Sequence, residues 1–330
     1  MNMKDTRNLR DQNRDKILAV FMERELCTKN QLALASSLTL TTVDNILQEL
    51  IDDNKVKKEM LKDNDKITEC YSLNKDFCRF LTISIIKEFR RVNIIYRISN
   101  LADEIIYSDE VIKKVVKIND IYDVINIVLV RFDNIKVIGI SIPGIINDGK
   151  VTSTGLVNFN DIDLYLLLKN KYDQKIILGN DVNVAAIGFY LTQESYQNVC
   201  LLFQPGDGYG GVGTVINGQL LTGKTNCAGE VQYLPLSNED QLKLLQTPDG
   251  TIELLSKIVA CLTAIVNPEI VAISCTNLEK ASDLDDCLAT MIPAKYLPRI
   301  VKITNLSKYV LNGLQYICKE SLKMNYLKEK

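Results

Sequence analysis

The stretch from Lys175 to Leu191, KIILGNDVNVAAIGFYL, decides the fold. It opens with a short apolar run, Lys175 to Leu178, that indicates a strand, and it closes with Asn183 to Leu191, which has the composition of a helix. Between them lies a polar loop that contains Gly179, Asn180 and Asp181. A strand that continues through a polar loop into a helix belongs to an α/β fold.

The segments on both sides repeat this pattern. Before it we expect strands at 80–86, 91–98, 104–107 and 135–140, with a helix at 120–131. After it we expect strands at 198–204, 211–216, 219–221 and 270–274, with helices at 251–266 and 305–327. Two similar α/β rounds predict a duplicated fold with a cleft between its halves.

The first seventy residues have a different organisation. A helix is expected at 14–24, and Thr28 and Thr39 are expected to be the N-caps of a second and a third helix. Two short strands around 55–60 and 67–71 then form a hairpin. This order predicts a winged helix-turn-helix domain over residues 1–74, followed by a body over 75–330 with lobes of roughly 75–180 and 181–330. A small helical cap without a DNA-binding role gives the same pattern.

In a winged helix-turn-helix, the third helix enters the major groove of double-stranded DNA. Residues 1–78 contain 13 Lys+Arg and 14 Asp+Glu, so only the distribution of the basic side chains favours DNA. The expected contacts are short polar side chains for bases or phosphates (Thr39, Thr41, Thr42, Asn45) and basic ones for phosphates (Arg7, Arg10, Arg14, Lys57, Lys58).

Composition excludes several classes of protein. The 330 residues carry 39 Lys+Arg against 41 Asp+Glu and are 46% hydrophobic, which is typical of a globular chain of two domains. There is no histidine, so His-based triads and His-containing zinc sites are excluded. Nine cysteines without a Cys-x-x-Cys pair indicate reduced thiols. No apolar run approaches the roughly 20 residues of a membrane span, and a polar N-terminus argues against a signal peptide, so we expect a cytoplasmic protein without a membrane partner.

Three motifs, in order, carry a resemblance that covers nearly the whole chain. They are Gly139 to Gly144, Asn180-Asp181-Val182-Asn183, and Ala228-Gly229-Glu230. The chain resembles the ROK family, which groups bacterial sugar kinases with sugar-responsive repressors. The resemblance implies an α/β fold in which an N-terminal winged helix-turn-helix precedes a duplicated actin/hexokinase-like (ribonuclease H-like) kinase body.

The resemblance also implies a sugar pocket. Its ligand-binding positions are Asn158, Asn180, Asp181, Glu230 and Gly144, and Asp181 matches the general base that deprotonates the attacking hydroxyl of the sugar. Each polar residue has a simpler interpretation. Asp181 is also a good N-cap for the helix near Asn183, Glu230 a solvated turn carboxylate, and Asn158 a loop hydrogen-bonding group.

The nucleotide and zinc motifs of the family are altered. The first phosphate loop, at 84–90, has neither Asp nor Gly, the second carries Asp207 among its glycines, and the adenosine turn is Ser274-Cys275-Thr276. Tyr233 stands where the family has a zinc-binding histidine. We therefore expect no zinc, ATP or magnesium cofactor and no catalytic residue, with Asp181 a vestigial general base.

The expected function is a DNA-binding transcriptional regulator, of the repressor type, that senses a sugar or sugar derivative and assembles as a homodimer or homotetramer. Two alternatives stay open. One is a residual ATP-dependent sugar kinase, and the other is a ligand-free regulator that uses the kinase fold as a dimerisation scaffold.

Overall fold

The chain folds into two compact units. The computed structural model describes residues 3–63, 66–152 and 154–327, and side chains within 9–62, 67–152 and 154–322. One unit, here called the N-terminal unit, comprises the chain up to Arg79 together with 100–104 and the residues from Lys319 on. The other, here called the body, comprises 80–99 and 105–318.

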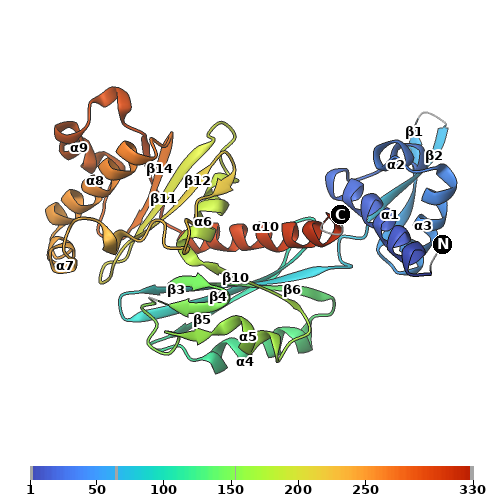
Figure 1. The fold of residues 1–330 in the computed structure, drawn as a ribbon, viewed down its shortest axis with the longest axis horizontal. Coiled ribbons are helices and arrows are strands. Elements are labelled where there is room, and N and C mark those ends of the chain that lie inside the picture. The colour runs from blue at the N-terminus through green and yellow to red at the C-terminus, as the bar shows by residue number, and fades with distance from the viewer. Residues whose placement is uncertain (1–2, 64–65, 153, 328–330) are drawn as a thin grey trace. The chain divides into compact units, whose positions relative to one another are not determined.

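The N-terminal unit contains three helices and a hairpin (Figure 1). The helices are α1 (Met3–Glu23), α2 (Lys29–Ser36) and α3 (Leu40–Asp52), and the antiparallel strands are β1 (Val56–Asp63) and β2 (Lys66–Leu73). Thr28 caps α2 in a capping box with Gln31, and the Thr39 hydroxyl accepts the Thr42 N–H at the start of α3. Both caps are those expected from the sequence.

The core of this unit joins all of its elements. Ile17 and Phe21 of α1 lie against Leu47 and Leu50 of α3 and against Tyr71 of β2, and all five are buried. Helix α1 begins eleven residues before its predicted start at Arg14. Two ion pairs accompany this longer helix: Arg10 with Glu49 of α3, and Arg14 with Asp53 directly after α3.

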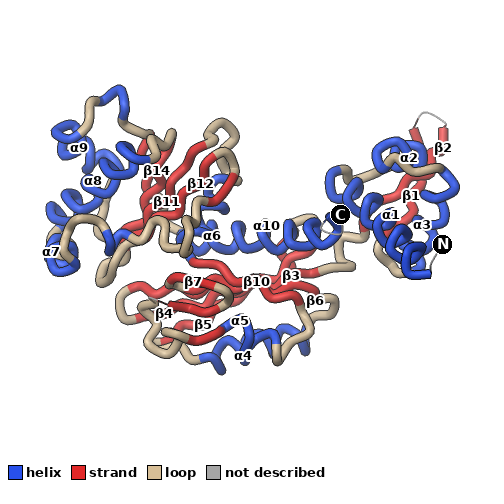
Figure 2. Tube along the Cα trace, viewed as in Figure 1, coloured by secondary structure: helices blue, strands red, loops and turns tan. Residues whose placement is uncertain are grey.

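The first half of the body is a five-stranded sheet. Its strands are β3 (Arg79–Glu88), β4 (Arg91–Asn100), β5 (Ile105–Lys113), β6 (Ile135–Ile142) and β10 (Lys175–Asn180), in the order β10-β6-β3-β4-β5. Helices α4 (Ile118–Arg131) and α5 (Leu164–Lys169) lie on one face of it (Figure 2). A small sheet of β7 (Ile145–Asn147), β8 (Lys150–Thr152) and β9 (Ile162–Asp163) follows β6.

The second half repeats the strand order of the first. Strands β11 (Asn198–Gln204), β12 (Gly211–Ile216), β13 (Gln219–Leu220), β14 (Ile270–Cys275) and β15 (Arg299–Lys302) are arranged as β13-β12-β11-β14-β15. In each half the first strand is central, the second and third extend to one side, and the fourth and fifth extend to the other. The helices of this half are α6 (Asp181–Tyr190), α7 (Asn238–Leu244), α8 (Pro248–Ile265), α9 (Asp285–Met291) and α10 (Leu306–Leu327), with 3₁₀ turns at Val231–Tyr233, Ala281–Leu284 and Ala294–Tyr296.

Helices α6 and α10 cross at two glycines. A Cβ on Gly188 would overlap the Tyr309 carbonyl, and one on Gly313 would overlap that of Val184, so both positions require the bare backbone. Helix α10 also contacts the first sheet, where the Arg97 guanidinium donates to Asn312 over 2.9 Å. Because α6 follows directly from β10, this crossing fixes the junction between Asn180 and Asp181 in the body. The loop expected at 179–181 is absent, since the strand runs directly into the helix.

The mixed α/β fold expected from the sequence is confirmed, including the repetition of its two halves. Strands β11 and β12 have the predicted bounds, whereas β5 runs six residues further than expected. None of the helices in the described part of the chain is long and apolar enough to cross a membrane.

Candidate functional site

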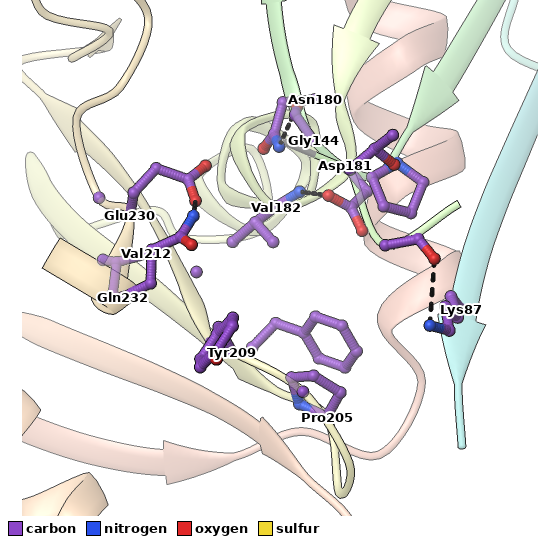
Figure 3. Close-up of a pocket in the computed structure, with 18 of the residues that line it drawn as sticks. Lys87, Gly144, Asn180, Asp181, Val182, Pro205, Tyr209, Val212, Glu230 and Gln232 are labelled. Carbon is purple, nitrogen blue, oxygen red and sulfur yellow. Dashed lines mark hydrogen bonds between the residues drawn. The ribbon is translucent and has the colours of Figure 1, made fainter. Parts of the chain in front are cut away.

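A pocket of about 450 Å³ lies in the body where the loops of its two halves face each other. Figure 3 shows Asp181 and Glu230 on opposite sides of the opening, with Tyr209 and Pro205 below them. The structure therefore brings four of the five expected ligand-binding residues to one cavity: Gly144, Asn180, Asp181 and Glu230.

Asn180, the last residue of β10, is hydrogen-bonded both to the turn after β6 and to the first turn of α6. Its amide nitrogen donates to the Gly144 carbonyl over 2.9 Å, and its amide oxygen accepts the Asn183 N–H over 2.9 Å. The second bond makes Asn180, and not Asp181, the N-cap of α6. Gly144 has φ +115, and a Cβ there would lie 2.8 Å from that of Thr154. Glycine is therefore required for the close approach of this backbone to the pocket.

Asp181 is the first residue of α6 and is 4% exposed. One carboxyl oxygen accepts the N–H of Val182 over 3.0 Å. Burial raises the pKa of Asp181 to about 7, and the negative charge of Glu230 adds to this effect. A carboxyl group with this pKa exchanges its proton near neutral pH, so it can donate a hydrogen bond to a ligand as well as accept one.

Glu230 faces Asp181 from a turn that the backbone holds in place. The Val212 N–H donates to the Gly229 carbonyl over 2.8 Å, and Glu230 forms a β-bridge with Gly211. The Gln232 amide donates to the Glu230 carboxylate over 3.0 Å, and burial raises the pKa of Glu230. The two carboxyl groups thus give one end of the pocket several hydrogen-bonding sites for hydroxyl groups.

Gln241 is a supporting residue that sequence reasoning missed. This buried side chain of α7 donates to the carbonyls of Val231 and Leu236, over 3.3 and 3.0 Å, and so holds the segment directly after Glu230. Its sequence signal was weak, because a glutamine four residues after the N-cap Ser237 is equally suited to a solvated helix face.

The segment after Glu230 does not fit a structural zinc ion. Tyr233 is 63% exposed, and neither cysteine nor histidine occurs between Glu230 and Cys261. Within the described ranges, no group of three or more Cys, Asp or Glu side chains is arranged to hold a metal.

The second phosphate loop is folded around a side chain of the protein. Gln204, 1% exposed, donates to the carbonyls of Pro205 and Gly208, over 2.9 and 2.8 Å. A Cβ on Gly210 would lie 2.5 Å from the Gln204 oxygen. The loop therefore wraps around the Gln204 amide, and the carboxylate of Asp207 is exposed at its tip.

The first phosphate loop contacts the second one. Phe89, at the β3–β4 turn, has φ 51, and its ring lies 2.5 Å from where a Cβ of Gly206 would be. The next residue inward, Glu88, accepts a hydrogen bond from Thr276 in the turn after β14. These contacts join the three places where the resemblance implies nucleotide contacts.

Asn158 is not brought to the pocket. It lies in an exposed turn, and its amide donates to the Val116 carbonyl over 3.0 Å. This contact agrees with the simpler interpretation of Asn158 as a hydrogen-bonding residue of a loop.

The residues expected to contact DNA lie on the N-terminal unit in three situations. Thr41 and Asn45 of α3 and Lys57 of β1 are exposed and make no side-chain hydrogen bond or ion pair within the described part of the chain. The hydroxyls of Thr39 and Thr42 bond each other over 2.8 Å in the cap. The remaining basic residues differ: Arg10, Arg14 and Lys58 pair with Glu49, Asp53 and Glu69, and Arg7 lies in the part of α1 whose side chains are outside the described residues.

Residues 99–244, which include the pocket motifs, match the ROK family. The chain contains a ROK family domain. The match covers strands of both sheets and ends within α7, so this ROK domain contributes most of the pocket.

Curated relatives of the ROK domain include both a repressor and a kinase. The chain is 28% identical over 100 residues to the xylose repressor of Bacillus subtilis, an alignment of 30% of this chain and 26% of that protein. It is 30% identical over 135 residues to the N-acetyl-D-glucosamine kinase of Haemophilus influenzae, an alignment of 39% of this chain and 42% of that enzyme. The chain thus spans less than half the length of these relatives.

Solved structures extend the likeness of fold. A ROK family transcriptional regulator, a homologue of the E. coli MLC protein, matches with a TM-score of 0.67 and 14% identity over 98% of this chain and 100% of that chain. The ROK hexokinase from Thermus thermophilus matches with a TM-score of 0.59 and 13% identity over 74% of this chain and 99% of that chain. The hexokinase structure aligns with about three quarters of this chain, and the regulator structure aligns with almost all of it. This difference agrees with a kinase-like body that carries an additional N-terminal unit.

Proposed function

We propose that this ROK protein is a transcriptional repressor that binds double-stranded DNA through a winged helix-turn-helix in its N-terminal unit. The observation that carries this proposal is the exposed polar face of α3, which begins with the Thr39 cap and presents Thr41 and Asn45. The carboxamide of Asn45 is suited to the paired acceptor and donor on the adenine edge in the major groove.

The charges around α3 favour an interface with DNA despite the acidic residues of the unit. Asp44 of α3 pairs with Lys29 over 2.5 Å, and Glu69 pairs with Lys58 over 2.5 Å. These pairs offset the carboxylates next to the polar face, while Lys57 stays available to a phosphate. The similarity to a repressor, the xylose repressor of Bacillus subtilis, supports the same assignment.

The body is the sensor in this proposal. Its pocket has hydrogen-bonding groups suited to sugar hydroxyls in Asn180, Asp181 and Glu230, whereas Phe89 and Gln204 close the phosphate loops. A sugar that binds one state of the protein more tightly than the other favours that state and so changes the affinity of the protein for DNA. The coupling is reciprocal, because DNA changes the affinity for the sugar by the same factor. Because operators with paired half-sites require paired reading helices, we expect a homodimer or a homotetramer.

A sugar kinase is the second candidate, and a specific observation favours it. Asp181 is buried at the start of α6 with a pKa of about 7, which suits a general base at neutral pH. A coupled ATPase assay with a panel of hexoses separates the candidates. Sugar-dependent turnover that Asp181→Asn abolishes would establish the kinase, whereas the contacts at Gly206 and Thr276 predict no turnover.

The DNA-binding proposal is tested by fluorescence anisotropy of the full chain with DNA from upstream of its own gene and with random DNA, over a salt titration. We expect specific binding, which Asn45→Ala weakens by roughly 1–3 kcal/mol on the specific DNA and much less on random DNA. Lys169→Ala, an exposed substitution in α5 of the body, is the matched control and is expected to leave both affinities unchanged. Equal binding of both DNAs at every salt concentration would instead make the N-terminal unit a helical cap.

A further inference from the structure

The pocket has two ends of different chemistry. Asn180, Asp181 and Glu230 line the polar end, and Phe203 and Tyr209 line the other, here called the aromatic end. The volume of about 450 Å³ lies within the range of roughly 300–1,000 Å³ that encloses drug-sized molecules. The hydrogen-bonding groups for a single sugar ring are concentrated at the polar end, so the aromatic end is left for another part of a ligand.

The aromatic end stands where the resemblance places the phosphoryl donor, and its chemistry does not suit an anion. The loop that would cradle phosphates is wrapped around the Gln204 amide, and its tip carries the carboxylate of Asp207. The ring of Phe89 covers Gly206. A negative group entering here meets the Asp207 carboxylate, whose charge repels it.

The charges of the whole lining lead to the same conclusion. Asp181, Asp207 and Glu230 face the cavity, and Lys87 is the single basic residue in the lining. The Lys87 ammonium already donates to the Gly155 carbonyl over 3.1 Å (Figure 3). An uncharged ligand avoids repulsion by the carboxylates of Asp207 and Glu230, whereas a phosphorylated sugar does not.

The aromatic end offers surfaces that suit a ring. Tyr209 is 39% exposed and borders the cavity, with Pro205 beside it (Figure 3). Aromatic rings bury large apolar areas, and pairs of aromatic rings favour offset or edge contacts. A second ring joined to the sugar would place its apolar face against Tyr209.

We propose that the aromatic end is a second binding subsite, and that the ligand of this ROK protein is a neutral glycoside whose sugar ring binds at Asn180, Asp181 and Glu230 and whose second ring lies against Tyr209. This inference rests on the proposed sugar-sensing function and narrows the ligand to disaccharides and aryl glycosides. It excludes sugar phosphates as preferred ligands.

Isothermal titration calorimetry of the full chain tests the proposal with matched probes. The probes are built on four sugars: glucose, galactose, mannose and N-acetylglucosamine. Each sugar is tested in its free form, as its α and β 4-nitrophenyl glycosides and as its 6-phosphate. Cellobiose, maltose and gentiobiose are the disaccharide probes. We expect at least one two-ring probe to bind about tenfold or more tightly than its free sugar, since a ring contact of this kind is worth about 1.4 kcal/mol. The 6-phosphate is expected to bind more weakly than the same free sugar.

Tyr209→Ala and Tyr233→Ala form the matched pair of variants. Tyr233 is 63% exposed and does not line the pocket, so its substitution is expected to change no affinity. Tyr209→Ala is expected to weaken the two-ring probe about tenfold and the free sugar less than twofold. An equal loss for both probes would overturn the subsite.

The remaining outcomes distinguish the inference from the proposed function. Binding of a free sugar with no gain from a second ring, or tightest binding of a 6-phosphate, overturns the subsite and leaves the sugar sensor intact. No binding of any probe overturns both and favours the ligand-free scaffold.

Discussion

Substitution of Asp181 by asparagine tests whether burial keeps this carboxyl group protonated near neutral pH. Burial raises the pKa of Asp181 from its ordinary 3.8 to about 7. Because the folded pKa lies above the unfolded one, the stability from holding this proton is fully present below pH 3.8 and is lost as the pH rises through about 7. Asparagine does not ionise. The pH-dependent loss of stability in the unaltered protein is absent from Asp181→Asn, so we expect this variant to gain roughly 2–3 kcal/mol relative to the unaltered protein between pH 5 and pH 8.

Hydrogen exchange followed by mass spectrometry, at a series of pH values, measures this gain within the body. Peptides from β6 and β10 report on the site, and those from β1 and β2 of the N-terminal unit are the internal reference. Asp207→Asn, at an exposed position on the same pocket, controls for the loss of a carboxylate and is expected to show no such gain. A stability difference between Asp181→Asn and the unaltered protein that is the same at pH 5 and pH 8 would refute the reasoning.

Three further substitutions test the supports of the pocket. Gly229→Ala is expected to destabilise the body by more than about 2 kcal/mol in thermal unfolding, because Gly229 has φ +89 and a Cβ there would overlap the Val212 carbonyl. Gly223→Ala is expected to cost less. Gly223 also has a positive φ, +71, but the nearest atom to its Cβ would be 3.4 Å away. Asn180→Ala removes the cap of α6 and is expected to cost about 1 kcal/mol, measured as faster hydrogen exchange at the start of that helix. Gln241→Leu leaves the carbonyls of Val231 and Leu236 without this donor. It is expected to lower stability by about 1–3 kcal/mol and to weaken sugar binding in calorimetry.

Local patterns predicted much of the fold. The β-branched runs at β11 and β12 ended at clear turn residues, so their bounds were correct. Thr28 and Thr39 were recognisable as N-caps because each precedes an apolar helical pattern at the right spacing. The start of α1 was misplaced because its first turns contain few apolar residues, and its ion pairs to Glu49 and Asp53 join residues 39 apart.

The candidate site was predictable only where a motif is local. The alternative interpretation of Asp181 as the N-cap of this helix was wrong, because the adjacent Asn180, also a good capping residue, is the N-cap of α6. The contact of Phe89 with Gly206 joins the tips of two hairpins far apart in the chain and has no signature in either. The contact of Asn158 with Val116 was also not predictable from the sequence, because the conformation of the loop determines which carbonyl an exposed amide reaches.

The central claim is that a ligand in the body pocket controls DNA binding by the N-terminal unit. The most direct measurement is the anisotropy of labelled upstream DNA with the full chain, with and without the sugar or glycoside that calorimetry shows to bind. We expect the ligand to change the affinity for specific DNA about 5- to 150-fold, and we expect Glu230→Gln, a substitution in the pocket, to reduce this effect. Saturation of the pocket with no change in DNA affinity would contradict it.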